Sequence, residues 1–159
     1  MYESVKEALV PYDNTTPAWS FNGQLLIAKV VDVYDGDTIT VVFPHANGIY
    51  KFKVRLDGID ACERISNDPE KKKLALAARN RILQLIGIDV GLDLFKEWSN
   101  KEVVDMLKIR PCFVSLTCKH FDKYGRILAD VATENDSSLS KVLINESLAC
   151  YYDGGTKPN

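Results

Sequence analysis

The stretch 33–43, "VYDGDTITVVF", joins two predicted strands through a turn that carries two carboxylates. Asp35-Gly36-Asp37 is a turn signal, and the residues on both sides are rich in valine, isoleucine and aromatic side chains. Asp37 has the same strand parity as three apolar residues that follow it. A carboxylate is costly to remove from water, so Asp37 either closes the turn or has a cationic partner.

The pattern on both sides of this turn predicts five strands and about three helices. The strands are expected at 24–34, 38–43, 49–59, 112–121 and 125–132, and the helices at 67–87, 99–108 and 138–150. Asp68 and Gly87 suit the two ends of the first helix, and Ser99 with Glu102 has capping-box spacing at the second. Three strands, a helix, two strands and a helix indicate a mainly β (α+β) fold, a five-stranded barrel of the OB type.

The first of these helices is expected to turn an apolar stripe toward the barrel. Its members follow helical spacing and are Leu74, Ala78, Ile82 and Leu85.

Length and composition fit one domain of 159 residues with a net charge of −2. That charge argues against coating of nucleic acid by bulk attraction, although a local basic site remains compatible with it.

No apolar run approaches the roughly 20 residues that cross a bilayer, so no membrane association is expected. The four cysteines form no CxxC pair and only two histidines are present, so zinc is not expected. We expect reduced thiols in an intracellular protein without a secretory signal.

Residues 1–22 are weakly patterned and are interpreted as an N-terminal arm, with or without one short helix, and the domain is placed at 23–159. Residues about 88–110 are interpreted as an insertion in this domain that contains Phe95, Trp98 and the short capped helix. This segment is expected either to be a helical flap that buries Phe95 and Trp98 on the barrel, or to contact a substrate or partner.

Five charged residues lie next to predicted strands: Asp37, Arg55, Asp60, Glu63 and Arg126. Each has a plain structural alternative. Arg55 could be solvated on the polar face of its strand, Asp60 and Glu63 could belong to the loop before the helix, and Arg126 could pair with Asp122 at the surface.

Together the five residues suit phosphodiester hydrolysis. Asp37 and Asp60 lie at strand ends that can converge at a barrel mouth, where two hard oxygen ligands suit Ca²⁺. Two arginines suit a phosphate, because their planar forks donate bidentately and stay charged. Glu63 remains available to orient or deprotonate a water.

The segments "DGDT", "RLDGIDACE" and "DKYGR" occur in this order and resemble the three signature segments of the staphylococcal nuclease (thermonuclease) family. The resemblance extends from about residue 25 to residue 155. It implies an OB-type barrel and a calcium-dependent nuclease, or endonuclease, that breaks the bond to the 5′ oxygen and leaves a 3′-phosphate. It also implies one Ca²⁺ ion in preference to Mg²⁺ or Mn²⁺, DNA or RNA as the substrate, and a monomer.

The resemblance also assigns roles to single residues. Asp37 and Asp60 correspond to carboxylate ligands of the metal, and Ala61 to a residue that contributes its backbone carbonyl. Glu63 corresponds to the acid that acts on the attacking water, and Arg55 and Arg126 to the arginines that hold the scissile phosphate. The family usually has Thr-Pro where this chain has Ala61-Cys62, which can loosen the loop before Glu63.

Four further residues resemble substrate contacts. Lys123 and Tyr124 correspond to a basic contact and a tyrosine near the nucleotide phosphate. Tyr151 or Tyr152, in the ending "LACYYDGG", could stack on a base, while packing in the core is an equal alternative for both.

Two rival functions stay open. The first is a non-catalytic OB module that binds nucleic acid or protein; such modules typically lose the metal carboxylates or the arginines, whereas this chain retains all five charged residues. The second is a phosphate-ester hydrolase for small nucleotides. Nothing in the sequence separates DNA from RNA, because two arginines in a groove contact the backbone.

Overall fold

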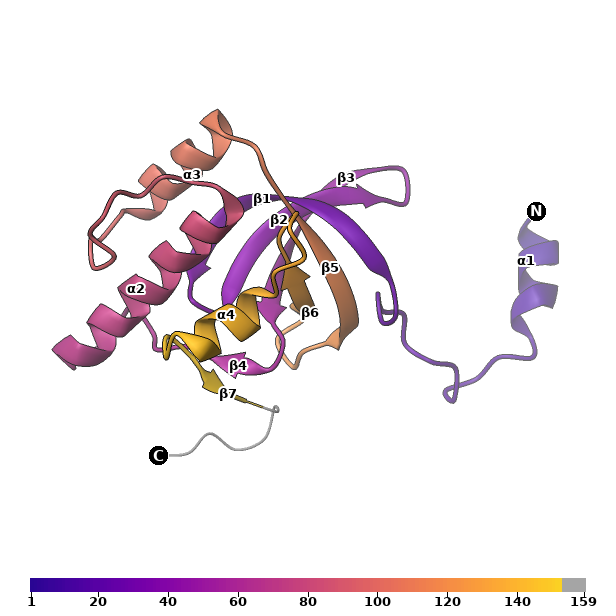
Figure 1. Ribbon diagram of the computed structural model, residues 1–159. Coiled ribbons are helices and arrows are strands. Elements are labelled where there is room, and N and C mark those ends of the chain that lie inside the picture. The colour runs from indigo at the N-terminus through magenta and orange to yellow at the C-terminus, as the bar shows by residue number, and fades with distance from the viewer. Residues whose placement is uncertain (153–159) are drawn as a thin grey trace.

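The computed structural model describes residues 1–152 of the chain (Figure 1). The strands are β1 (Leu25–Asp35), β2 (Thr38–His45), β3 (Gly48–Leu56), β4 (Ile59–Asp60), β5 (Cys112–Phe121), β6 (Ile127–Ala132) and β7 (Cys150–Tyr151). The helices are α1 (Tyr2–Leu9), α2 (Pro69–Ile86), α3 (Asn100–Ile109) and α4 (Leu139–Asn145).

Five strands close into a barrel in the order β1-β2-β3-β6-β5, which confirms the predicted five-stranded α+β barrel. Every neighbouring pair is antiparallel except β3 and β6, which run parallel. β4 and β7 form a separate two-stranded sheet beside the barrel. The described residues contain four helices, one more than the number predicted, and the additional helix is α1.

The barrel core follows the alternation of the strands. Val33, Ile39, Val41 and Leu56 are fully buried. β2 and β3 are joined by a tight turn, in which Ala46 has a left-handed φ of 52°. The inward side chains of all five strands therefore form one apolar centre, and the charged residues lie at its rim.

The long helix α2 packs against β1 and begins and ends as its sequence predicts. Asp68 accepts a hydrogen bond from the amide of Glu70, and Gly87 ends the helix with a left-handed φ of 110°. The predicted apolar stripe is wrong at Leu74, which is 40% exposed. The buried face is broader than one stripe, because it also receives the segment between α2 and α3 and therefore includes polar side chains.

Two of these polar side chains hold the 88–110 segment in place. Arg79, almost fully buried, donates to the carbonyls of Val33 and Trp98, and Asn80 donates to the carbonyls of two further residues of the segment. Trp98 packs against the core, whereas Phe95 is 53% exposed, so the expected burial is correct for the first and wrong for the second. The capping box at Ser99 is present at the start of α3.

The N-terminal residues contribute to the fold only near their end. Figure 1 shows α1 apart from the barrel, and no residue of α1 is buried. Phe21 is buried, and its ring packs edge-on against Phe43 and Phe52. The aromatic core therefore extends back to residue 21.

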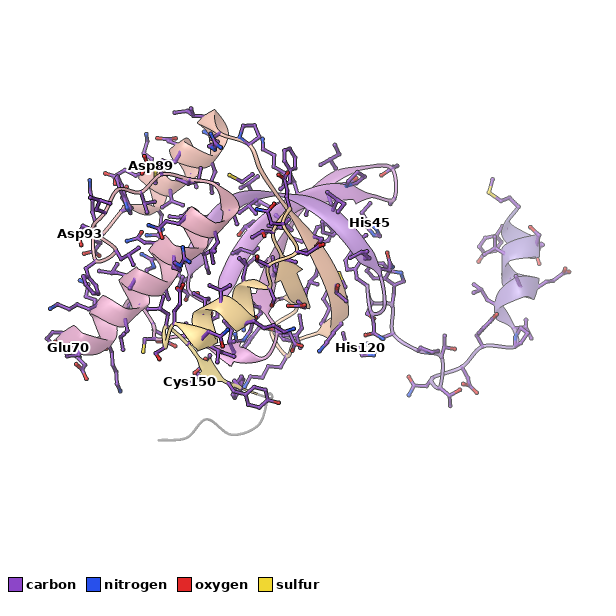
Figure 2. All side chains as sticks on the ribbon, in the orientation of Figure 1. His45, Glu70, Asp89, Asp93, His120 and Cys150 are labelled. Carbon is purple, nitrogen blue, oxygen red and sulfur yellow. The ribbon has the colours of Figure 1, made fainter. Side chains whose placement is uncertain are left out.

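All four cysteines lie within the described residues and are free thiols, two of them buried. None of the helices described is both long enough and apolar enough to span a lipid bilayer. Figure 2 shows the acidic side chain of Glu70 at the start of α2, and those of Asp89 and Asp93 on the segment between α2 and α3.

Candidate active site

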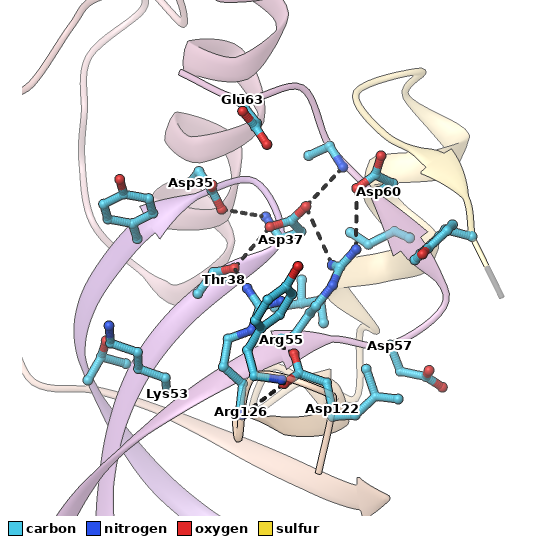
Figure 3. Close-up of a pocket in the computed structure, with 18 of the residues that line it drawn as sticks. Asp35, Asp37, Thr38, Lys53, Arg55, Asp57, Asp60, Glu63, Asp122 and Arg126 are labelled. Carbon is cyan, nitrogen blue, oxygen red and sulfur yellow. Dashed lines mark hydrogen bonds and ion pairs between the residues drawn. The ribbon is translucent and has the colours of Figure 1, made fainter. Parts of the chain in front are cut away.

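A cleft of about 1010 Å³ opens at the rim of the barrel, where β1 and β3 end and β2 begins. Its walls come from segments far apart in the chain: the β1–β2 turn, the end of β3, β4 and the loop after it, the β5–β6 turn, and Tyr152. All five charged residues singled out from the sequence line this cleft, as Figure 3 shows.

Asp37 lies at the centre of the cleft and is held from several sides. Its Oδ1 accepts a hydrogen bond from the hydroxyl of Thr38, and its Oδ2 accepts one from the amide of Ala61 at 3.2 Å. Its carbonyl accepts the amide of Leu56 at 2.8 Å, which ties the turn to β3. Asp37 is therefore more than a turn residue, because its carboxylate joins the β1–β2 turn to the segment that follows β4.

Gly36 allows this turn to lie against its neighbours. A Cβ atom at Gly36 would lie 2.6 Å from the Cβ of Ala78 on α2 and 2.8 Å from the Cβ of Ala61. Contacts this short cannot be accommodated without a shift of the backbone. The glycine is therefore required by close approach to α2, and its position fixes that of Asp37.

Arg55 lies between the two proposed metal ligands. Its Nη1 is 3.4 Å from Oδ2 of Asp37 and its Nη2 is 3.3 Å from Oδ1 of Asp60. The residue is only 8% exposed, so the alternative of a solvated strand arginine is wrong. The carboxylate of the β1–β2 turn and that of β4 thus converge on one guanidinium. The Nη1 atom is buried and donates no hydrogen bond within residues 1–152, although it lies beside Asp37.

Arg126 enters the cleft from the β5–β6 turn. Its Nε donates to Oδ2 of Asp122 at 2.6 Å, and its Nη1 lies 3.4 Å from the hydroxyl of Thr38. Thr38 is paired with Arg55 across β2 and β3, so the two arginines approach the same part of the rim. The expected pairing with Asp122 is present, but it lies in the wall of the cleft and not on the open surface.

Glu63 lies in the loop between β4 and α2 and is exposed at the cleft. Figure 3 shows its carboxylate directed toward Asp37, on the side away from Arg126. No hydrogen bond or ion pair holds this carboxylate within the part of the chain that the structure describes. Glu63 is therefore available to a water molecule in the cleft.

The proposed substrate contacts divide into two groups. Lys123 and Tyr124 line the cleft, and the Tyr124 ring lies under Arg126, with 5.3 Å between its centroid and Cζ. Tyr152 also lines the cleft, with its ring centroid 5.5 Å from Cζ of Arg55. Tyr151 lies on β7, is 75% exposed and is absent from the described lining. Of the two C-terminal tyrosines, the structure brings only Tyr152 to the site.

Negative charge is crowded in the cleft. Among the described residues, seven acidic and five basic side chains line it. Burial and the neighbouring carboxylate of Asp37 raise the pKa of Asp35 to about 7. Burial also raises the pKa of Asp32. The acids outnumber the bases even though Arg55 pairs with both Asp37 and Asp60, so the cleft suits a further cation on carboxylate oxygens.

The ligand set available to such a cation is small. Residues 1–152 contain no group of three or more histidine, cysteine or acidic side chains that could hold a metal ion. A hard cation would therefore take oxygen from Asp37, Asp60 and the carbonyl of Ala61, with water completing its shell. The donors are all oxygen, which fits Ca²⁺ better than a soft transition metal.

Three residues of the cleft were not assigned a role from the sequence. Asp35 accepts the amide of Asp37, Thr38 bridges Asp37 and Arg126, and Asp122 holds Arg126. The first two belong to the quoted "DGDT" motif and the third opens "DKYGR". Their positions inside the motifs were the available signal. Most of their hydrogen-bond partners are within four residues in the chain, and only the contact between Thr38 and Arg126 joins distant segments.

Comparison with known proteins adds one positive result. The profile of the family described as staphylococcal nuclease homologue matches residues 53–159. The match includes Arg55, Asp60, Glu63 and Arg126, and it begins after Asp37. A search of curated proteins found no match. Because the family profile covers more than half of the chain, and the chain folds as a closed five-stranded barrel, the protein belongs to the staphylococcal nuclease homologue family.

Proposed function

We propose that this protein is a Ca²⁺-dependent nuclease that hydrolyses phosphodiester bonds of DNA or RNA and leaves 3′-phosphate ends. One observation carries the proposal. Arg55 is buried between Asp37 and Asp60, yet its Nη1 makes no hydrogen bond within residues 1–152. The ion pair with Asp37 at 3.4 Å is too long to satisfy this buried donor fully, and a phosphate oxygen in the cleft would satisfy it.

The chain's own residues divide the work of hydrolysis. Arg55 and Arg126 donate to the non-bridging oxygens of the scissile phosphate, where negative charge grows as the reaction proceeds. Glu63 orients a water molecule and accepts its proton as the oxygen–phosphorus bond forms. The bond from phosphorus to the 5′ oxygen breaks, and the leaving alkoxide takes a proton from solvent. Asp37, Asp60 and the Ala61 carbonyl would hold the cation, which would supply further positive charge to offset the charge that grows in the transition state.

The direct test is digestion of single- and double-stranded DNA and RNA with Ca²⁺, with Mg²⁺ or with EDTA. We expect cleavage with Ca²⁺, little with Mg²⁺ and none with EDTA. Product ends are identified by whether a phosphatase that removes 3′-phosphates makes them extendable by a polymerase. Full activity in EDTA would refute the metal site, and absence of cleavage together with binding would favour the non-catalytic module. A dinucleotide substrate, compared with a polynucleotide, separates a nuclease from a hydrolase of small nucleotides.

Glu63→Gln keeps the shape of the side chain and removes its basicity. We expect turnover to fall by about 10²-fold or more. Glu70→Gln is the matched control, because Glu70 lies in the first turn of α2 and is outside the described lining of the cleft. A turnover of Glu63→Gln close to that of Glu70→Gln would remove Glu63 from the mechanism.

Cation binding also has a readout that does not need activity. A ligand that binds only the folded state raises the unfolding temperature as its concentration rises. We expect Ca²⁺ to raise the unfolding temperature of the wild type and to have no effect on Asp37→Asn or Asp60→Asn. Asp105→Asn, a surface acid that pairs with Lys101, serves as the control and retains the shift. An equal Ca²⁺ shift in all four proteins would place the ion elsewhere.

A further inference from the structure

One wall of the cleft carries an aromatic and cationic pair that the proposed hydrolysis does not use. Tyr34 lies near the end of β1 and remains 44% exposed. Arg64 lies over its ring, with 4.8 Å between Cζ and the ring centroid. Both side chains line the cleft that contains Asp37 and Arg55. A tyrosine and a guanidinium stacked together at an open cleft offer flat surfaces of the kind on which bases stack.

The barrel topology places this pair away from the tyrosines already discussed. In the barrel, β2 has β1 on one side, and on its other side it has β3, which is followed by β6. Tyr34 is thus on the β1 side of Asp37, while Tyr124 and Arg126 come from the turn that leads into β6. Figure 3 likewise shows Asp35 and Lys53 on one side of Asp37 and Asp60 on the other. The proposed phosphate site therefore has aromatic side chains on both sides.

Arg64 does not depend on Tyr34 alone for its position. Its Nη2 donates to Oδ1 of Asn100 at 3.0 Å, and Asn100 is the first residue of α3. The same Oδ1 accepts Nη2 of the buried Arg79 at 2.9 Å. Since Arg79 joins the 88–110 segment to the barrel, Asn100 is fixed, and Arg64 is fixed through it. The 88–110 segment is therefore connected to the cleft through the contact of Asn100 with Arg64.

Cationic charge continues from the pair along the same wall. Lys53 lies on β3, is exposed and is paired in register with Thr40 of β2. Both residues line the cleft. Within residues 1–152 no ion pair joins Lys53 to an acid. A backbone phosphate adjacent to a base stacked on Tyr34 would meet this ammonium group.

We propose that Tyr34 and Arg64 form a second nucleotide subsite, which binds a base beyond the two nucleotides that flank the scissile phosphate of a single-stranded polynucleotide, and that Asn100 positions Arg64 for this contact. The subsite rests on the proposed function and refines its substrate class. Stacking accepts every base and requires an unpaired one, so the subsite favours single strands without selecting a sequence.

Binding by a catalytically impaired protein tests the subsite separately from cleavage. In the Glu63→Gln background with Ca²⁺, we measure fluorescence anisotropy of labelled single-stranded hexanucleotides and dinucleotides. Tyr34→Ala should weaken hexanucleotide binding by about tenfold, the scale of one lost stacking contact, and leave the dinucleotide nearly unchanged. Tyr34→Phe should bind as the parent does. Tyr50→Ala is the matched control, because Tyr50 is similarly exposed and lies outside the described lining.

A scan with a single abasic nucleotide then locates the contact. At one position of the hexanucleotide, the abasic nucleotide should weaken binding to the parent Glu63→Gln protein. At the same position it should not weaken binding to the protein that also carries Tyr34→Ala. Asn100→Ala should weaken hexanucleotide binding as Arg64→Ala does, and Asn100→Asp, which keeps the acceptor, should restore it. Unfolding temperatures of the variants exclude a general loss of structure.

Equal weakening for both lengths, or an unchanged affinity in Tyr34→Ala, would overturn the subsite. Absence of any hexanucleotide binding would overturn it as well. If the wild type cleaves no polynucleotide but hexanucleotide binding depends on Tyr34, the proposed hydrolysis fails and the subsite stands. If the wild type cleaves and Tyr34→Ala binds the hexanucleotide normally, the proposed hydrolysis stands and the subsite fails.

Discussion

The carboxylate of Asp122 accepts hydrogen bonds from both the backbone amide and the side chain of Arg126, at 2.9 Å and 2.6 Å. The amide of Tyr124 donates to the same carboxylate at 2.8 Å. One acid thus closes the β5–β6 turn and sets the direction of the arginine that the turn carries. The turn and the phosphate contact are a single structural unit.

Asp122→Asn should lower kcat/KM by about tenfold, less than the loss expected when the arginine itself is removed. The variant keeps an acceptor for the backbone amides and loses the charge that holds Nε of Arg126. Steady-state kinetics on a single-stranded substrate check this, with Asp105→Asn as the surface control. A rate equal to that of the control would mean that Arg126 is oriented without Asp122.

The same acid should contribute to stability in a pH-dependent way. Burial alone would raise the pKa of Asp122, but hydrogen bonds from Arg126 and Tyr124 outweigh it and hold the pKa below its ordinary value. A folded-state pKa below the unfolded value gives stability that is present above the unfolded pKa, about 4, and is lost as the pH falls through the folded value. Asp122→Asn should therefore be less stable by about 1–2 kcal/mol near neutral pH, with a smaller difference in acid. Urea unfolding across that range measures both, and a difference that stays constant with pH would contradict the assignment.

Gly36→Ala should destabilise the fold by about 1–3 kcal/mol, the usual cost of overpacking, and should also weaken Ca²⁺ binding. The added Cβ meets the Cβ atoms of Ala78 and Ala61, which cannot rotate away. Gly48→Ala is the matched control, since its Cβ would meet only the ring end of Tyr50, a flexible group. Calorimetry with and without Ca²⁺ gives both quantities. Equal unfolding temperatures for the two variants would show that the turn can move away from α2.

Arg79→Met should cost about 3 kcal/mol or more, because the carbonyls of Val33 and Trp98 would lose their buried donor. Burial, and next the charge of Arg64, lower the pKa of Arg79 to about 10, which leaves it charged near neutral pH. Arg81→Met on the same helix is the control. It removes a half-exposed pair with Glu146 and should cost about 1 kcal/mol or less. Similar urea midpoints for the two variants would mean that the 88–110 segment is held by other contacts.

The sequence was most informative where a local rule decides the structure. Period-two alternation and turn residues predicted the strands, and Asp68, Gly87 and Ser99 cap helices as expected. Ordered motifs predicted which charged residues line the cleft. These features depend on neighbours within a few positions in the chain, which is the range over which residue patterns carry information.

The errors came from contacts between distant segments. Leu74 is exposed because α2 buries Arg79 and Asn80 against the 88–110 segment, and the apolar pattern alone did not reveal this arrangement. Tyr34 and Arg64 are about thirty residues apart, and only the folded chain brings a ring and a guanidinium together. Side-chain hydrogen bonds across such separations have no local signature.

Asp60 lies on the short strand β4, whose ladder partner in the described structure is β7. In the order of synthesis, Cys150 and Tyr151 of β7 leave the ribosome after Asp37, Arg55, Glu63 and Arg126. A nascent chain therefore carries these acids and arginines before it has the strand that holds Asp60 in register. Backbone pairing at the far end of the described chain is thus needed to complete the wall of the cleft that carries Asp60.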